Sequence, residues 1–287
     1  MKPLHLLLIA ALMTACHPVH DCSQSSSPIR LNQVGYMPLQ EKTATLNVDD
    51  PNAAPLRVYV LSNDTDTVLT TSATPTLVNS VSGKYRQIVD FTQLTAEGDY
   101  TLCVPALDAK QVFHISSHPY RELTRQALRA FYYQRASMPI VEPYAEGWDR
   151  PAGHPDDHVL VHPSAATDER PEGTILACPG GWYDAGDYNK YIVNSGYTMG
   201  VYLMAYLQNP AYYQSLTLNI PESGSGVPDM LSEAMYNIQW MLTMQDTDGG
   251  VYHKLTEASF EGFIAPKDCK KTRYVVLKTT AAALDFA

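Results

Sequence analysis

Two aspartates lie three residues apart in the segment Asp184-Ala185-Gly186-Asp187. The small residues between them keep the loop narrow, so a ligand can approach both carboxylates closely. Two carboxylates placed in this way can hold one water molecule and withdraw its proton, as the base of an inverting glycosidase must do. The structural alternative is an aspartate that caps the following helix through an Asx-turn, and the four residues alone favour that alternative.

A longer motif surrounds this pair: Gly-Gly-Trp-Tyr-Asp-Ala-Gly-Asp-Tyr-Asn-Lys, from Gly180 to Lys190. It closely resembles the signature at the start of the catalytic domain in glycoside hydrolase family 9. Further segments follow the order of that family: Glu222–Asp229 resembles the start of its next helix, and Asp248–Lys254 resembles its substrate-lining loop. Ile29–Tyr36 resembles the immunoglobulin-like module that precedes many of these catalytic domains. The resemblance therefore covers residues 29–287.

The resemblance implies a fold and a reaction. The fold is an (α/α)6 barrel, and the reaction is the hydrolysis of internal β-1,4-glucosidic bonds with inversion. The second aspartate of the family motif is the base, so the resemblance assigns that role to Asp187 and makes Asp184 its partner in holding the water. His253 corresponds to a family histidine that contacts substrate in the cleft; the alternative is that it ties down a loop. We expect Trp182 and Tyr183 to lie in the core.

Inversion also needs a carboxylic acid that protonates the leaving oxygen, about 6.5–9.5 Å from the base. The resemblance implies that this acid is a glutamate near the far end of the catalytic domain. Twelve helices with short connections need about 200–300 residues, which is more than residues 118–287 supply. We therefore expect a C-terminally truncated chain that lacks the acid and is inactive by itself. Four glutamates do not match the context of the acid: Glu222, Glu233, Glu257 and Glu261.

The sequence supports no cofactor. Many members of the family hold a structural zinc ion with two cysteines and two histidines, but the corresponding positions here include Ala136 and Gly153, and only His154 of that local pattern is kept. Asp246–Gly249 begins like a calcium-binding EF-hand loop, yet the two residues that follow break the pattern. Four cysteines match no zinc spacing and allow three disulfide pairings: Cys22, Cys103, Cys178 and Cys269.

The composition bears on the partner. The chain has 30 acidic residues against 20 lysines and arginines, a formal net charge of −10, whereas nucleic-acid binding calls for a basic face. Its 19 tyrosines suit a sugar-binding surface, because the ring stacks and the hydroxyl forms hydrogen bonds. Filling of half-buried positions is an equal alternative. Together with the resemblance, this indicates a β-glucan polysaccharide as partner, no nucleic acid, and a monomer.

Residues 1–16 are typical of an export signal. Leu4–Leu12 is a short apolar run after a lysine, and Met13–Cys16 resembles a bacterial lipoprotein cleavage box. We expect Cys16 to carry lipid and residues 17–27 to form a polar tether; an ordinary secretory signal is the alternative. The protein is then an outer-membrane or cell-surface lipoprotein of the bacterial envelope, in contact with the membrane only through its lipid anchor, or it is secreted.

Residues 28–117 have the pattern of short strands separated by turn residues, which predicts an all-β immunoglobulin-like sandwich. Tyr100 is placed as in a tyrosine corner. No cluster of ionisable groups occurs here, so we expect a packing or positioning module. The predicted strands are Ile29–Tyr36, Lys42–Val48, Leu56–Leu61, Thr67–Thr71, Tyr85–Phe91, Asp99–Val104 and Gln111–Ile115.

Residues 118–287 have a helical pattern, which we interpret as the N-terminal part of the all-α (α/α)6 glycosidase domain. A long loop over residues 138–177 precedes the motif, and a loop of that length is usually functional or disordered. The predicted helices are Tyr120–Ser137, Tyr191–Gln208, Pro228–Gln245 and Val275–Ala287. The third of these is expected to bury an apolar stripe of Leu231, Ala234, Met235, Ile238 and Leu242.

Two other functions stay open. A non-catalytic β-glucan-binding surface protein on the same scaffold would keep the aromatic residues but need not keep both aspartates. A different inverting enzyme would act on a decorated or mixed-linkage β-glucan, such as xyloglucan.

Overall fold

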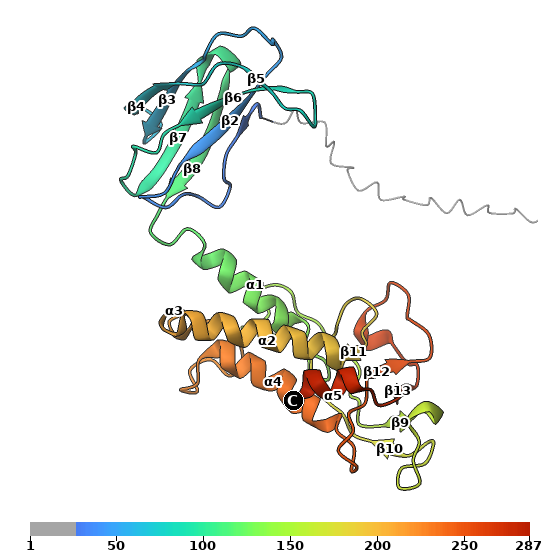
Figure 1. Cartoon of the computed structure of the whole chain (residues 1–287). Helices are drawn as coiled ribbons and strands as arrows, with labels where there is room; N and C mark the ends of the chain where they lie inside the picture. Colours follow the sequence, from blue (N-terminus) through green and yellow to red (C-terminus); the bar gives the residue numbers. More distant parts are fainter. Residues whose placement is uncertain (1–26) are drawn as a thin grey trace, which may run out of the picture. The chain divides into compact units, whose positions relative to one another are not determined.

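The computed structural model describes residues 27–287. The chain divides into two compact units, with the boundary between Tyr120 and Arg121 (Figure 1). No helix of the described part is long and apolar enough to cross a membrane. Cys16, the export signal and almost all of the tether lie outside the described residues, so their assignments stay predictions.

The first unit is a sandwich of two four-stranded sheets (Figure 1). The first sheet has the order β1-β2-β6-β5, formed by β1 (Ile29–Arg30), β2 (Thr43–Val48), β5 (Leu77–Val78) and β6 (Tyr85–Asp90). The second has the order β4-β3-β7-β8, formed by β3 (Arg57–Ser62), β4 (Asp66–Ser72), β7 (Gly98–Val104) and β8 (Ala109–Ile115). Alternate residues of β2 are buried, as expected for strands with one face on a core.

The predicted β-sandwich is confirmed, with two differences. The segment predicted as one strand from Ile29 to Tyr36 pairs as β1 over only two residues, because the chain then turns through Gly35, whose φ is +112°. The short β5 was missed, since two exposed residues carry no alternation pattern. The hydroxyl of Tyr100 donates to the carbonyl of Ala96 over 3.0 Å, the backbone contact expected of a tyrosine corner.

The second unit combines helices with a small sheet. Its helices are α1 (Arg121–Tyr133), α2 (Ile192–Gln208), α3 (Pro210–Gln214), α4 (Asp229–Thr243) and α5 (Thr280–Phe286). α2 packs against both α4 and α5 (Figure 1). The contact with α5 requires Gly196, because a Cβ atom there would come within 2.2 Å of the carbonyl oxygen of Asp285. The first three predicted helices are present, whereas the predicted helix from Val275 begins only at Thr280.

A five-stranded sheet in this unit was not predicted. Its order is β10-β9-β13-β12-β11, formed by β9 (Val159–Val161), β10 (Ile175–Leu176), β11 (Lys190–Tyr191), β12 (Lys254–Glu257) and β13 (Arg273–Val275). Strands of two to four residues are too short to show periodicity, and their partners lie far apart in the chain. Part of the segment predicted as a long loop thus belongs to a sheet that ends at the Gly180–Lys190 motif.

The buried face of α4 differs from the predicted stripe. Met235 and Leu242 are 45% and 60% exposed, whereas Glu233 and Asn237 are fully buried. The prediction failed because it counted only apolar residues, whereas α4 buries three polar residues, Asp229, Glu233 and Asn237. The other buried residues of the helix are Met230, Ala234, Trp240 and Met241.

Glu233 is buried because Arg135 neutralises it. The guanidinium of Arg135 lies 3.0 Å from Glu233 and 2.9 Å from Glu222, and the indole N–H of Trp182 donates to Glu233 over 2.8 Å. Burial raises the pKa of Glu233, and the charge of Arg135 opposes that rise. This cluster ties the end of α1 to α4 and to the motif.

Arg135→Ala should therefore destabilise the second unit strongly. It leaves Glu233 buried without a cation, which costs about 3–5 kcal/mol. Denaturant unfolding followed by tryptophan fluorescence measures the loss in this unit alone, because the three tryptophans are Trp148, Trp182 and Trp240. Arg125→Ala is the control: its partners Glu122 and Glu146 are 68% and 33% exposed, and each such pair contributes about 1 kcal/mol or less. Equal losses in the two variants would contradict this account.

Candidate active site

The first half of the motif is part of the core. Trp182 and Tyr183 are 5% and 3% exposed, as predicted, and the backbone N–H of Trp182 donates to Oδ1 of Asn237 over 3.1 Å. Gly181 has a φ of +76°, and a Cβ atom there would lie 2.6 Å from the ring of Trp240. Only glycine fits this position, so the backbone of the motif packs directly against Trp240 of α4.

The chain then leaves the core and forms an exposed loop. The N–H of Asp184 donates to the carbonyl of Asn189 over 2.9 Å, and the N–H of Tyr188 donates to that of Ala185 over 3.1 Å. These two bonds close the loop that carries both aspartates. Beyond the loop the chain passes through β11 into α2, so both carboxylates lie close to the N-terminus of that helix.

The two aspartates differ in their contacts. Asp187 is half-buried and accepts hydrogen bonds from the Tyr191 hydroxyl (2.8 Å) and from the Asn189 side-chain amide (3.1 Å) and backbone N–H (3.4 Å). Asp184 is exposed, and its Oδ1 accepts from the amide of Asn194 over 2.7 Å. Neither aspartate caps α2, because the N-cap residue is Tyr191. The helix-capping alternative is therefore wrong, although the bond from the N–H of Asn189 to Asp187 is of the Asx-turn type that this alternative included.

A hollow with a volume of about 130 Å³ lies beside Asp184. Tyr191, which precedes α2, and Asn194, in its first turn, line the hollow together with Asp184. Burial and the bond to Asp187 raise the pKa of Tyr191 to about 12, so its hydroxyl stays a proton donor at ordinary pH. The remaining lining residues are Phe131, Gln134, Trp182, Tyr183, Ser195 and Thr198.

His253 lies at the same end of α2. Its carbonyl accepts from the N–H of Ile192, the first residue of the helix, over 3.1 Å. Its Nδ1 lies 3.0 Å from the hydroxyl of Thr279, which caps α5 by accepting from the N–H of Ala282. The structure thus brings His253 to the end of α2 next to the motif; contact with a sugar stays a prediction.

The residues at the family zinc position do not fit a zinc ion. Ala136 offers no ligand, and a Cβ atom on Gly153 would lie 2.5 Å from the Cβ of Pro266. Nδ1 of His154 is bonded to the hydroxyl of Tyr183 over 2.9 Å. No group of three or more histidine, cysteine or acidic side chains that could hold a metal occurs among residues 27–287.

The carboxylates of the calcium-like loop, Asp246–Gly249, are paired with a lysine and an arginine of the same unit. Nζ of Lys278 lies 2.8 Å from Asp246 and 2.5 Å from Asp248, and Arg170 lies 2.9 Å from Asp246. These cations neutralise the carboxylates that a calcium ion would need. The three cysteines of the described part, Cys103, Cys178 and Cys269, are free thiols.

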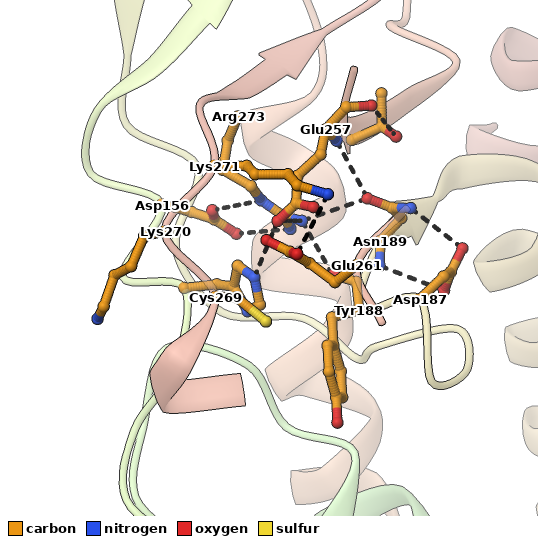
Figure 2. A network of polar contacts seen from close by, with 12 residues as sticks. Asp156, Asp187, Tyr188, Asn189, Glu257, Glu261, Cys269, Lys270, Lys271 and Arg273 are labelled. Carbon is orange, nitrogen blue, oxygen red and sulfur yellow. Dashed lines mark hydrogen bonds and ion pairs between the residues drawn. The ribbon is translucent and has the colours of Figure 1, made fainter. Parts of the chain in front are cut away.

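A buried ionic network beneath the loop was not predicted (Figure 2). Asp156 lies 2.8 Å from Nζ of Lys190 and 3.0 Å from Nε of Arg273. Burial alone would raise the pKa of Asp156, but the charges of Lys190 and Arg273 outweigh it and hold the pKa below its usual range. Burial lowers the pKa of Lys190 to about 8. The one local sign of this network in the sequence was a lysine inside the motif. The other two members, Asp156 and Arg273, lie outside the motif and far from each other in the chain.

Both units of the chain are similar to known protein families. The family model "Glycosyl hydrolase family 9" matches residues 120–287, and "Cellulase N-terminal ig-like domain" matches residues 24–109. A xyloglucan-specific endo-beta-1,4-glucanase of Bacteroides ovatus is 47% identical over 281 residues, 98% of this chain and 47% of that protein. Endoglucanase D of Acetivibrio thermocellus is 31% identical over 266 residues, 92% of this chain and 41% of that protein.

Solved structures show the same similarity. One described as Bacteroides ovatus GH9 has a TM-score of 0.84 and 48% identity, covering 90% of this chain and 47% of that chain. A metagenome-derived glycoside hydrolase family 9 endoglucanase has a TM-score of 0.77 and 32% identity, with coverage of 90% and 47%. The chain spans about half the length of the relatives it matches.

Stability of the second unit should fall as the pH falls from 6.5 to 4. Burial lowers the pKa of His154 from 6.5 to about 4, helped by the charge of Arg273. Between these values the unfolded chain binds a proton that the folded chain refuses, which costs about 1–3 kcal/mol in total. The measurement is the free energy of unfolding against pH for the parent and for His154→Gln, which lacks the titrating group.

The comparison of the two proteins isolates the histidine. Burial raises the pKa of Glu257, which acts in the opposite sense, but Glu257 is present in both proteins. The parent should show the steeper loss between pH 6.5 and 4. Parallel curves would show that His154 does not titrate in this way.

Proposed function

The chain belongs to glycosyl hydrolase family 9, and we propose on this basis that the whole protein is an inverting endo-β-1,4-glucanase. The observation that carries the proposal is the pair of aspartates on one exposed loop at the N-terminus of α2, one of them held by three hydrogen bonds. An inverting base must withdraw a proton from a water molecule on the face of the sugar opposite the leaving group. A carboxylate fixed in one orientation is suited to that task.

We assign the two carboxylates different roles. Asp187 accepts the proton of the attacking water, because its contacts with Tyr191 and Asn189 fix its direction. Asp184, which is exposed beside the hollow, helps to hold the same water. The positive end of the α2 dipole favours negative charge at this position.

The proton for the leaving oxygen comes from a second carboxyl group, about 6.5–9.5 Å from the base. The glutamates of the second unit with contacts near the motif are engaged in other pairs. Glu222 and Glu233 bind Arg135, Glu257 faces His154, and Glu261 lies 3.1 Å from Lys271. We therefore assign the acid to none of them.

Xyloglucan is the favoured substrate within this class. The relative named as xyloglucan-specific is 47% identical to this chain, against 31% for Endoglucanase D. The similarity to that relative extends over 98% of the chain. We propose a preference for a decorated β-1,4-glucan over an undecorated one.

Asp187→Asn should lower kcat by about 10²–10⁴, the usual contribution of a general base, with little change in glucan affinity. Because the chain spans about half the length of its relatives, the assay is made on the whole protein, with reducing ends measured for rate and calorimetry for affinity. Asp149→Asn, which removes the charge of an exposed aspartate in the same unit, is the control and should match the parent. Activity of Asp187→Asn within tenfold of the parent would place the base elsewhere. A parent that binds glucan without hydrolysing it would favour a non-catalytic binding protein.

Initial rates on three soluble polysaccharides test the substrate preference. We expect kcat/KM on xyloglucan to exceed that on carboxymethyl cellulose and on mixed-linkage β-glucan by about tenfold or more, equivalent to about 1.4 kcal/mol in transition-state binding. A kcat/KM on carboxymethyl cellulose equal to that on xyloglucan would contradict the proposed substrate preference. It would leave the proposal of an endoglucanase intact.

A further inference from the structure

We propose that Asn189 is a positioning residue for Asp187, and that Arg273 and Asp156 hold the amide of Asn189 in the orientation that this task requires. The inference rests on the proposed function, since it takes Asp187 as the base. Figure 2 shows the chain of contacts from Asp156 through Arg273 and Asn189 to Asp187.

The orientation of the Asn189 amide follows from its partners. Its Oδ1 accepts from the backbone N–H of Glu257 over 3.2 Å and from Nη1 of Arg273 over 3.3 Å. A flipped amide would turn its NH₂ group towards these two donors and leave Asp187 facing an oxygen atom. Since an amide has one acceptor end and one donor end, the two donors force Nδ2 to point at Asp187, where it donates over 3.1 Å.

Arg273 is itself fixed. Its Nε donates to Oδ1 of Asp156 over 3.0 Å, and its Nη1 also donates to the carbonyl of Tyr188 over 3.0 Å. The other oxygen of Asp156 lies 2.8 Å from Nζ of Lys190. Arg273 therefore holds both the carbonyl of Tyr188, the residue before Asn189, and the side chain of Asn189. Lys190, the residue after Asn189, is itself held by Asp156.

The ammonium group of Lys190 also donates to two backbone carbonyls at and just before the start of the motif. Its Nζ donates to the carbonyl of Cys178 over 3.0 Å and to that of Gly180 over 2.7 Å. The ammonium thus has an acceptor for each of its three N–H bonds. The two ends of the motif, Gly180 and Lys190, are joined through this one buried group.

Burial of these charges is hard to explain by stability alone. Asp156 and Lys190 are 3% and 0% exposed, and Arg273 is 6% exposed. Removing such groups from water costs several kcal/mol each, and their mutual attraction often does no more than offset that cost. What the network does achieve is a single position for Asn189. Displacing a catalytic group by about 1 Å can lower the rate about 10²-fold. An amide fixed in one orientation therefore helps to keep the carboxylate of Asp187 in its working position.

Asn189→Asp removes the hydrogen bond that residue 189 donates to Asp187 and keeps its ability to accept from Arg273 and Glu257. The new carboxylate has the same shape and can still accept from Arg273 and from the N–H of Glu257. It loses the N–H bond to Asp187 and faces that carboxylate with a like charge. In the whole protein we expect kcat on xyloglucan to fall about 10–100-fold, while KM, oligosaccharide affinity and the thermal midpoint of the second unit stay close to the parent values.

Asn219→Asp is the matched control. It makes the same chemical change in the same unit, at a half-buried residue bonded to Glu146 and to the carbonyl of Pro143, and it should leave kcat unchanged. If Asn189→Asp does not fold, Asn189→Ser removes the amide without adding charge and is measured by the same criteria.

The outcomes are separable. A loss of kcat with unchanged KM and thermal midpoint supports the inference. A kcat within threefold of the parent overturns it, and so does a parallel loss of kcat, affinity and thermal stability, because that pattern indicates a structural role only. If Asp187→Asn is inactive while Asn189→Asp behaves as the parent, this inference alone fails. If Asp187→Asn is active, the proposed function fails first.

Discussion

The ion pairs of Asp156 with Lys190 and Arg273 are the constraint on which the candidate site depends. They lie at the junction of three segments that are distant in the chain: the segment before the small sheet, the motif, and β13. A buried carboxylate between two cations has few alternative arrangements, because each displacement leaves a charge without a partner. The exposed loop of Asp184 and Asp187 can therefore be short and still hold its shape.

A second ionic cluster fixes the other side of the motif. Arg135 joins α1 to Glu233 of α4, and Glu233 accepts from the indole of Trp182. The motif thus runs from one buried cluster to another, with the exposed Asp184 and the half-buried Asp187 between them. This arrangement places rigid, desolvated contacts under the loop and leaves its carboxylates free to meet a ligand, as a preorganised site requires. The β-sandwich has an aromatic cluster of Tyr36, Phe91 and Phe113 in its core, whereas the two ionic clusters on either side of the motif lie in the second unit.

How far the sequence predicted this structure depends on the range of each interaction. The aspartate pair, the burial of Trp182 and the strands of the sandwich were accessible because their signals are local: a contiguous motif, or alternation along one strand. The network of Asp156 and Arg273 was not, since the two residues lie 117 positions apart and nothing in either neighbourhood indicates the other. α4 shows a related limit, because Glu233 is polar in sequence and becomes a core residue only through Arg135, 98 positions away in the segment just after α1. The small sheet escaped prediction for the same reason: its strands are stabilised by partners and not by their own pattern.

The most direct test of the central claim is a crystal structure of the whole protein with a xyloglucan oligosaccharide bound across the point of cleavage. The account predicts a water molecule about 2.6–3.2 Å from a carboxylate oxygen of Asp187, also in contact with Asp184, on the side of the sugar ring opposite the leaving oxygen. Asn189 should still donate to Asp187 in that complex. A water held by another carboxylate, or a sugar bound away from both aspartates, would contradict the account.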